Sequence, residues 1–230
     1  MSMNLTDNLA PIIKKNQFDK FATDFLQKYC PEALISPIPV PIETIASTGM
    51  GLVVKYVSIT EDLSELGKIF FTDGSTDIYL KETDEYRTVE VKRGTIFIDN
   101  DVQAKRNKGS ERFTLAHECV HWDKHRMYHL LQSTADKSTA VAHRCPNKTF
   151  TENNARTDEE WMEWQADGIA AAILMPREVF LKKAQEIAIK EKEQLVSKIA
   201  AYFRVSEQAA EIRLSELNSS FKNLNFMGCI

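Results

Sequence analysis

Five residues near the middle of the chain, His117-Glu118-Cys119-Val120-His121, have the spacing H-E-x-x-H. On an α-helix, residues four apart lie on the same face, one turn from each other. The two imidazoles can therefore point at one metal ion, and neutral imidazole nitrogen is a good ligand of zinc. Glu118 follows the first histidine, so its carboxylate can reach a water molecule at the metal. The pattern predicts two zinc ligands and a general base.

The residues around this motif predict a packed helix. Ser110 is expected to cap the helix, and the charge of Glu111 suits its first turn. An apolar stripe beside the histidines is formed by Phe113, Ala116 and Val120. Two histidines on a helix are often simply solvated, but such a stripe lets the helix pack and the site become partly buried.

A second helix, predicted from Glu159 to Met175, offers a third ligand. Asp158 is expected to cap it, and its second half is almost wholly apolar and must be buried. A catalytic zinc site usually has three protein ligands and one open position. Glu163 fits best, because it can face inward while the neighbouring acids face water. Asp167, one turn further on, could accept the other N–H of a ligating histidine. The alternative is that these acids form only a solvated helix start.

The composition is that of an ordinary globular chain. Its 230 residues are 43% hydrophobic, which is enough to bury a core. The formal net charge of −4 gives no basic footprint for nucleic acid, and no apolar run approaches the length of a transmembrane helix. The four cysteines are scattered without a C-x-x-C pair, at positions Cys30, Cys119, Cys145 and Cys229. We therefore expect a cytoplasmic protein with free thiols and no membrane partner.

The N-terminal part predicts a helix followed by a small sheet. Residues 1–29 carry an apolar stripe at helical spacing. Strands are expected at residues 52–59, 68–72, 76–80, 86–91 and 95–98. Turn residues at Asp73-Gly74 and at 92–94 predict two hairpins. We therefore expect a small, largely antiparallel sheet, joined by a charged loop at 99–108 to the helix that carries the H-E-x-x-H motif.

Two features could serve a substrate. The strand Thr95–Ile98 is a candidate sheet edge with which an extended peptide could pair. Four residues could stabilise an oxyanion by their chemistry alone, namely Tyr128, His125, His129 and His143. The sequence does not choose between them.

The segment between the two ligand-bearing helices is expected to be irregular. The first helix is predicted to continue beyond the motif, and its axis carries His125 and His129 away from the metal, so that they flank the cleft. Residues 133–158 are polar and are expected to form a loop beside the cleft. Within that loop, His143 and Cys145 have the chemistry of a second metal site, which is the less favoured interpretation of a loop-like context.

After Pro176 the chain predicts a helical subdomain. Helices are expected at residues 177–192, 194–203 and 207–217, and the last two have the rhythm of a helix-turn-helix. Residues 176–230 contain nine Lys and Arg against seven Asp and Glu, whereas DNA binding needs a concentrated basic face. Direct binding of nucleic acid is therefore not expected, and a helical cap packed on the rest of the chain is preferred. The predicted divisions of the chain are residues 1–35, 36–176 and 177–230.

Two stretches together resemble the ImmA/IrrE family of zinc metallopeptidases. Residues 113–121, F-T-L-A-H-E-C-V-H, are similar to the family's H-E-x-x-H helix. Residues 163–176, E-W-Q-A-D-G-I-A-A-A-I-L-M-P, are similar to its second motif. The similarity extends over residues 38–217. About forty residues separate the two motifs, which is longer than we expect for the family.

The resemblance implies a zincin-like α+β fold, in which a small sheet packs on the H-E-x-x-H helix and on a second helix that bears a glutamate. It implies that His117, His121 and Glu163 bind Zn²⁺. It implies that Glu118 is the general base, and it places Asp167 on the family's Asn/Asp position.

The implied function is that of a zinc-dependent endopeptidase. Members of the family are associated with cutting helix-turn-helix repressors in mobile elements and stress responses, so a transcriptional repressor or similar regulatory protein is the implied substrate. The alternative is a non-proteolytic regulator that binds a repressor or DNA through residues 194–217. A structural zinc site is a further alternative. Such sites are usually closed and often contain Cys, whereas Cys119 is expected to face away from the metal.

Overall fold

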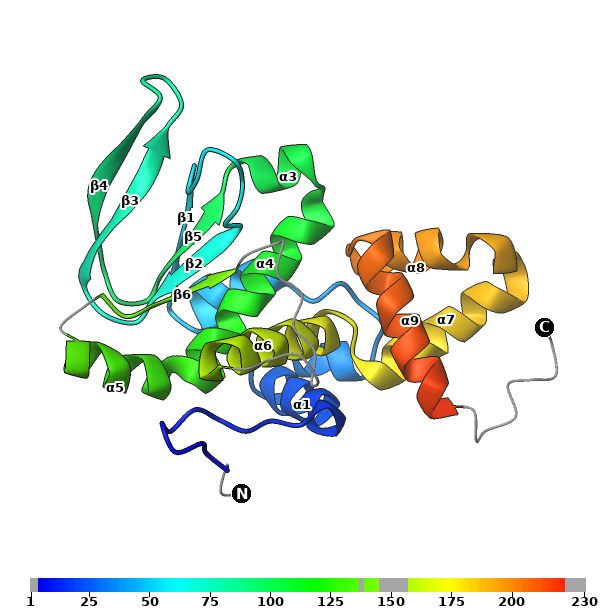
Figure 1. Ribbon diagram of the computed structural model, residues 1–230. Coiled ribbons are helices and arrows are strands. Elements are labelled where there is room, and N and C mark those ends of the chain that lie inside the picture. The colour runs from blue at the N-terminus through cyan, green and yellow to red at the C-terminus, as the bar shows by residue number, and fades with distance from the viewer. Residues whose placement is uncertain (1–3, 137–138, 145–156, 222–230) are drawn as a thin grey trace.

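A computed structural model describes residues 4–136, 139–144 and 157–221 of the chain (Figure 1). Helix α4 (Lys108–Val120) lies between a four-stranded sheet and helix α6 (Asp158–Leu174). Helix α1 (Phe18–Tyr29) packs on α6. The result is a mixed α+β architecture, compatible with a zincin-like fold, in which α4 is buried along most of its length.

Two separate sheets are formed. The larger sheet has the order β1 (Val53–Val57), β5 (Thr95–Asp99), β2 (Gly67–Phe70) and β6 (Val141–Arg144). β1 pairs with β5 in parallel, and the other two pairings are antiparallel. The strands β3 (Gly74–Leu80) and β4 (Glu85–Val91) pair only with each other, and Figure 1 shows this hairpin projecting beyond the larger sheet.

The predicted hairpins are therefore wrong, although most of the strands lie where they were expected. Asp73-Gly74 does not join two paired strands, because the chain leaves the larger sheet there and enters the smaller one. Residues 92–94 return it to the larger sheet, where the Gly94 amide donates to the Phe70 carbonyl at 2.8 Å. Turn residues indicate that the chain reverses, but they do not determine which strands pair.

The prediction that Thr95–Ile98 forms a sheet edge is also wrong. β5 lies between β1 and β2, and all five of its residues are buried. The two edges are formed by β1 and by β6, and β6 lies within the segment that was expected to be irregular. Helix α5 (Arg126–Asp136) precedes it. The short run Val-Ala-His-Arg is a weak strand signal, and it becomes a strand because the open side of β2 offers it a partner.

The predicted helix over residues 1–29 begins much later than expected. Residues 4–14 form no helix, and a short turn, η1 (Lys15–Gln17), leads into α1. Pro11 pairs with Leu5 in an isolated bridge, which a helix cannot make. The Asn8 side chain donates to Asp158 at the start of α6 at 2.9 Å, so this segment lies against that helix.

Several short helices connect the main elements, namely η2 (Pro31–Leu34), α2 (Ile42–Thr44), η3 (Ile45–Gly49) and α3 (Asp101–Lys105). The last of these lies in the segment that was expected to be a loop. Two helix caps also differ from the prediction. The Asn107 side chain accepts the Ser110 amide at 2.8 Å and caps α4. Thr157 caps α6 in a reciprocal capping box with Glu160.

The C-terminal helices are α7 (Arg177–Glu191), η5 (Lys192–Gln194), α8 (Leu195–Phe203) and α9 (Glu207–Phe221). Their buried apolar side chains belong to the same core cluster as those of α1, α4 and α6. Among the described residues, every helix is too short or too polar to span a lipid bilayer.

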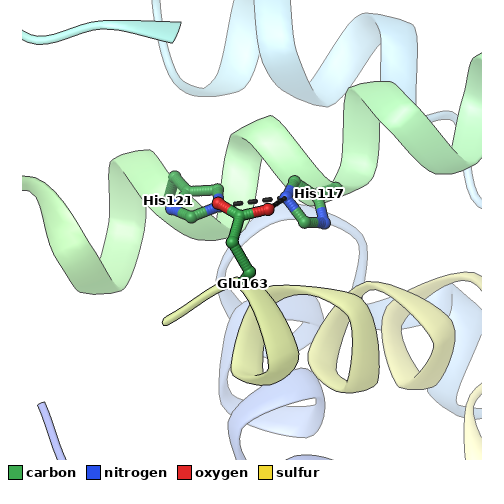
Figure 2. Close-up of side chains that lie close together, drawn as sticks. All are labelled: His117, His121 and Glu163. Carbon is green, nitrogen blue, oxygen red and sulfur yellow. Dashed lines mark hydrogen bonds and ion pairs between the residues drawn. The ribbon is translucent and has the colours of Figure 1, made fainter. Parts of the chain in front are cut away.

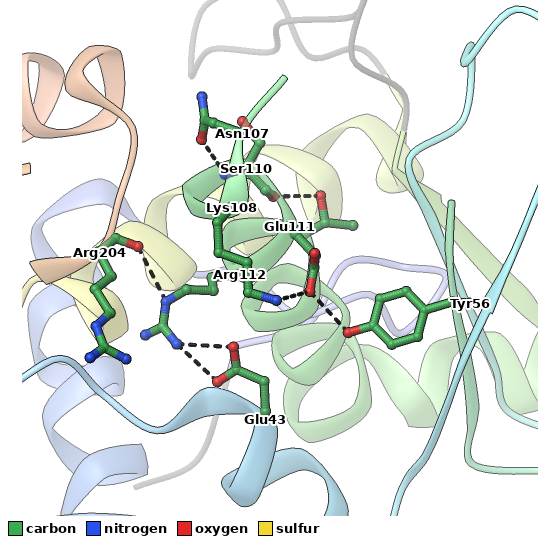
Figure 3. A network of polar contacts seen from close by, with 9 residues as sticks. Glu43, Tyr56, Asn107, Lys108, Ser110, Glu111, Arg112 and Arg204 are labelled. Atoms are coloured by element: carbon green, nitrogen blue, oxygen red, sulfur yellow. Dashed lines mark hydrogen bonds and ion pairs between the residues drawn. The ribbon is translucent and has the colours of Figure 1, made fainter. Parts of the chain in front are cut away.

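One arginine joins the start of α4 to two distant parts of the chain (Figure 3). Arg112 is 4% exposed. Its guanidinium donates to both carboxylate oxygens of Glu43 in α2, at 3.1 and 2.9 Å. It also donates to the Arg204 carbonyl, between α8 and α9, at 3.2 Å. The orientation of α4 is therefore tied to the N-terminal connector and to the C-terminal helices.

Close backbone contact occurs at the same place. A Cβ atom at Gly109 would lie 2.5 Å from the backbone nitrogen of Ser206. Real Cβ atoms are not found so close to backbone, so the junction between α4 and the C-terminal helices requires glycine here.

We expect Gly109→Ala to lower the free energy of unfolding by about 1–3 kcal/mol, because the added methyl group forces two backbones apart. At an open helical position the same change stabilises by about 1 kcal/mol. Urea denaturation measures the difference, with the exposed Gln103→Ala in α3 as the control. A stabilised Gly109→Ala variant would contradict the close contact.

Candidate metal centre

Three side chains from two helices converge on one point (Figure 2). His117 lies in α4, and His121 begins a π-helical turn, η4 (His121–His125), that continues it. Glu163 reaches both imidazoles from α6, with its two oxygens 3.2 Å from His117 Nε2 and 3.1 Å from His121 Nε2. One donor atom from each residue lies within 4.8 Å of the others. Two nitrogens and a carboxylate are thus gathered as ligands of a metal would be.

Burial of the two helices holds these side chains in place. His117 and His121 are 0% and 1% exposed. The second half of α6 is apolar, and Ile169, Ile173 and Leu174 are at most 1% exposed. That half anchors α6 in the core, and the first half, which carries the glutamate, is thereby held against α4.

Asp167 lies one turn after the glutamate and contacts the far side of the first imidazole. Its Oδ1 is 2.9 Å from His117 Nδ1, so Nδ1 donates and Nε2 is turned toward Glu163. The Arg144 guanidinium, on β6, lies 3.6 Å from the same carboxylate oxygen. The orientation of His117 is therefore set by a charged pair behind it.

The electrostatics of the cluster favour a positive charge at its centre. Burial lowers the pKa of His117, but the carboxylates of Glu163 and Asp167 outweigh burial and raise that pKa to about 10. Burial likewise opposes ionisation of Glu163, yet the two imidazoles hold the pKa of its carboxyl well below the usual range. The site thus stabilises a proton strongly, and a divalent cation would place positive charge in the same position.

Glu118 is the one carboxylate of the cluster without a partner. It is 0% exposed, and within the described residues neither of its oxygens accepts a hydrogen bond. Burial raises the pKa of its carboxyl to about 8. An orphaned buried carboxylate is rare and requires an explanation. A carboxyl group with a pKa near neutrality is suited to accept and return a proton.

Space for this carboxylate depends on a glycine that sequence reasoning missed. A Cβ atom at Gly67, in β2, would lie 2.8 Å from Glu118 Oε1 and 2.6 Å from a methyl carbon of Thr114. Because Glu118 is on the neighbouring helix, only the pairing of sheet and helix reveals this contact. No local signal distinguishes Gly67 from an ordinary strand glycine.

His125, as expected, is not among the three gathered donors, but the expectation that it flanks the cleft is wrong, because it is buried behind His121. In η4 its ring remains over the preceding histidine, with His125 Nδ1 3.0 Å from His121 Nδ1. His125 Nε2 lies 3.1 Å from Gln165 Oε1, and His125 is 0% exposed. Sequence reasoning also missed Gln165. The four-residue spacing of the histidines was a usable signal, but the π-helical turn could not be predicted.

A cavity of about 400 Å³ opens beside His121 and Glu163. Its walls include β6 and the first turn of α6. His143 lines it from β6, with Nδ1 3.3 Å from a Glu65 oxygen, and His129 lines it from α5. A molecule of moderate size can therefore reach His121 and Glu163 through this cavity.

The other predicted site residues are placed as follows. His129 stacks on Phe71 with ring centroids 4.6 Å apart. The Tyr128 hydroxyl donates to the Glu159 carboxylate. Cys119 is buried, unpaired and part of the apolar core. Cys145, which was considered with His143 for a second metal site, lies outside the described residues.

Two histidines and a glutamate gathered on buried helices match the ligand set of some catalytic zinc sites. The model of the IrrE N-terminal-like domain of peptidase family M78 matches residues 68–215, well over half of the chain. The chain therefore belongs to this family, which supports metallopeptidase activity at the level of the family.

Among solved structures, a Mycobacterium tuberculosis transcriptional regulator is similar, with a TM-score of 0.48 and 12% sequence identity. The similarity covers 87% of this chain and 46% of the regulator, so the chain spans less than half of that protein's length. No curated protein matches the sequence.

We expect metal-free Glu118→Gln to become more stable than the metal-free wild type as pH rises. The neutral form of Glu118 is favoured in the folded state, so its stabilising contribution is complete below pH 4.5 and is lost as pH rises through about 8. The glutamine side chain does not ionise, so the variant does not lose this contribution as pH rises. Between pH 5 and pH 9, the free energy of unfolding of the variant should rise by roughly 2–4 kcal/mol relative to that of the wild type.

Thermal unfolding of chelator-treated protein at several pH values measures this gain. The exposed Glu178→Gln in α7 controls for the loss of one carboxylate. Parallel curves for the wild type and Glu118→Gln would mean that burial does not hold Glu118 neutral.

Proposed function

We propose that the chain is a zinc-dependent endopeptidase, in which His117, His121 and Glu163 hold the metal and Glu118 is the general base. The observation that carries this proposal is the convergence of three buried donor atoms beside a buried carboxylate without a partner. Membership of a peptidase family supports the reaction class.

The donor set fits catalytic zinc. Two imidazole nitrogens and one carboxylate are three protein ligands, which leave a fourth position for water or substrate. The cavity lies beside two of the three residues, so that position faces accessible space. Structural zinc sites are usually closed and often rich in cysteine, and Cys119 belongs to the core and not to this donor set.

When bound, zinc supplies a Lewis acid that polarises a peptide carbonyl and lowers the pKa of water to about 7. Glu118 then takes a proton from the attacking water and returns a proton to the leaving amine. The burial that leaves this carboxylate without a partner also keeps its pKa near that of such a water. Asp167 holds His117 with Nε2 toward the metal position.

The substrate backbone is proposed to pair with β6. This strand pairs with β2 on one side, and among the described strands its other side is unpaired. It also forms a wall of the cavity. An extended peptide can add a strand to an open sheet edge. A peptide paired with β6 would pass the proposed metal ligands. His143 is the favoured oxyanion donor, because it lies on the same strand and lines the cavity. His125 and Tyr128 are engaged elsewhere, and His129 is stacked on Phe71 in another element.

The proposed substrate is a transcriptional repressor or a similar regulatory protein in the cytoplasm. The resemblance of both motifs to the ImmA/IrrE family supports this choice of substrate. The buried free thiols of Cys30 and Cys119 suit a reducing compartment. The alternative, a regulator that binds without cutting, would depend on α8 and α9 rather than on Glu118.

Purified protein is expected to contain about one zinc per chain. Glu163→Ala should weaken zinc binding by a factor of 100 or more, roughly the loss of one ligand, because it removes a carboxylate 3.1 and 3.2 Å from the two imidazoles. Glu159→Ala, one turn earlier in the same helix, is the matched control. Competition with a chromogenic chelator measures both, and equal effects would move the third ligand elsewhere.

Glu118→Gln should keep zinc but lose at least about 100-fold in cleavage rate, because the amide cannot accept the proton of the attacking water. Co-expression with a repressor-like protein encoded nearby, followed by a search for a cut fragment, compares it with the wild type. Retained regulatory function in Glu118→Gln would favour the non-proteolytic alternative, and undiminished cleavage would remove Glu118 from the mechanism.

A further inference from the structure

A chain of hydrogen bonds runs from the second proposed ligand into the protein interior. His121 Nδ1 lies 3.0 Å from His125 Nδ1. His125 Nε2 lies 3.1 Å from Gln165 Oε1. The Gln165 amide nitrogen donates to the Pro11 carbonyl at 2.8 Å. The two imidazoles are at most 1% exposed, as is Gln165, so these direct contacts are shielded from bulk solvent.

The donor and acceptor roles in this series of hydrogen bonds are fixed at the Pro11 carbonyl. The carbonyl of Pro11 can only accept, so the Gln165 amide must present its NH₂ to that carbonyl and its oxygen to His125. The flipped amide would place two oxygens against each other and an N–H toward the ring. His125 Nε2 must therefore carry a hydrogen and donate it.

The neutral form of His125 then determines the state of His121. In the described part of the chain, the hydrogen-bond partners of His125 are an amide oxygen and another imidazole, so a buried imidazolium would be uncompensated. With its hydrogen on Nε2, neutral His125 has a bare Nδ1 that accepts. His121 must donate from Nδ1, and its Nε2 is left bare. That Nε2 lies 3.0 Å from His117 Nε2, from which it can accept a hydrogen bond when no metal is bound, and 3.1 Å from Glu163.

We propose that His125, with Gln165 and the Pro11 carbonyl behind it, is a positioning relay that fixes His121 in the tautomer required of a metal ligand. This inference rests on the proposed function, because it assigns a role at the same metal centre. Asp167 has the corresponding position behind His117, but it is charged. A neutral imidazole orients His121 without adding another carboxylate to the cluster.

The first test examines the tautomers in metal-free wild-type protein. Long-range ¹H–¹⁵N correlation spectra distinguish the two ring nitrogens of each histidine. We expect His121 to be protonated at Nδ1 and His125 at Nε2, so that neighbouring rings are opposite tautomers. His121 protonated at Nε2 would overturn the relay, whatever the protein does with zinc.

The second test measures zinc affinity. His125→Phe keeps the ring and removes the acceptor, and we expect about 10–100-fold weaker binding. His125→Asn should restore affinity to within about three-fold, because the amide oxygen stands near the position of Nδ1. His129→Phe is the matched control, since His129 stacks on Phe71 and makes no described hydrogen bond to a proposed ligand. If His125→Phe does not fold, Gln165→Met is used instead, because it removes the oxygen that accepts from His125 Nε2.

The two proposals can fail separately. A wild-type protein that binds no zinc would overturn the proposed function, while the tautomer pattern would still decide the relay. A His125→Phe variant that binds zinc as tightly as the wild type, with His121 still protonated at Nδ1, would overturn the relay and leave the metal site intact.

Discussion

Exclusion of water from the contact between α4 and α6 is the constraint on which the site depends. His117 and His121 are almost completely buried, so each ring nitrogen needs a partner within the protein. Asp167 satisfies one nitrogen of the first ring, and His125 satisfies one of the second. The remaining nitrogens face Glu163. Burial thus selects the ligand atoms, because it leaves only the two Nε2 atoms turned toward Glu163.

Features that depend on local periodicity could be predicted from the sequence. The contact between His117 and His121 follows from a spacing of four, which holds in any α-helix. The approach of Glu163 and Asp167 to the histidines was predictable from their place before a long apolar run, since that run must be buried. The boundaries of α7, α8 and α9 also lie near their expected positions, because each has a clear helical pattern.

Features that depend on distant partners could not be predicted. The junction at Asp73-Gly74 looks like a hairpin turn, but it connects two sheets, and nothing local indicates this. β6 exists because β2 has an open side, and Gly67 is needed because Glu118 approaches it from a helix. The π-helical turn at η4 and the contact of His125 with Gln165 on α6 likewise have no local signal. In each case the cause lies in tertiary packing.

β6 contributes to two properties of the proposed peptidase. The strand is paired with β2 on one side and lines the cavity, whereas the proposed ligands and base are held by helices. Arg144 lies behind Asp167 and His143 is the proposed oxyanion donor, so both belong to the hydrolytic apparatus. Val141 also lines the cavity, but it packs against a separate apolar cluster that includes Phe70 and Phe97. Related proteins could therefore diverge in what they cut through a change at Val141 while the rest of the strand stays unchanged.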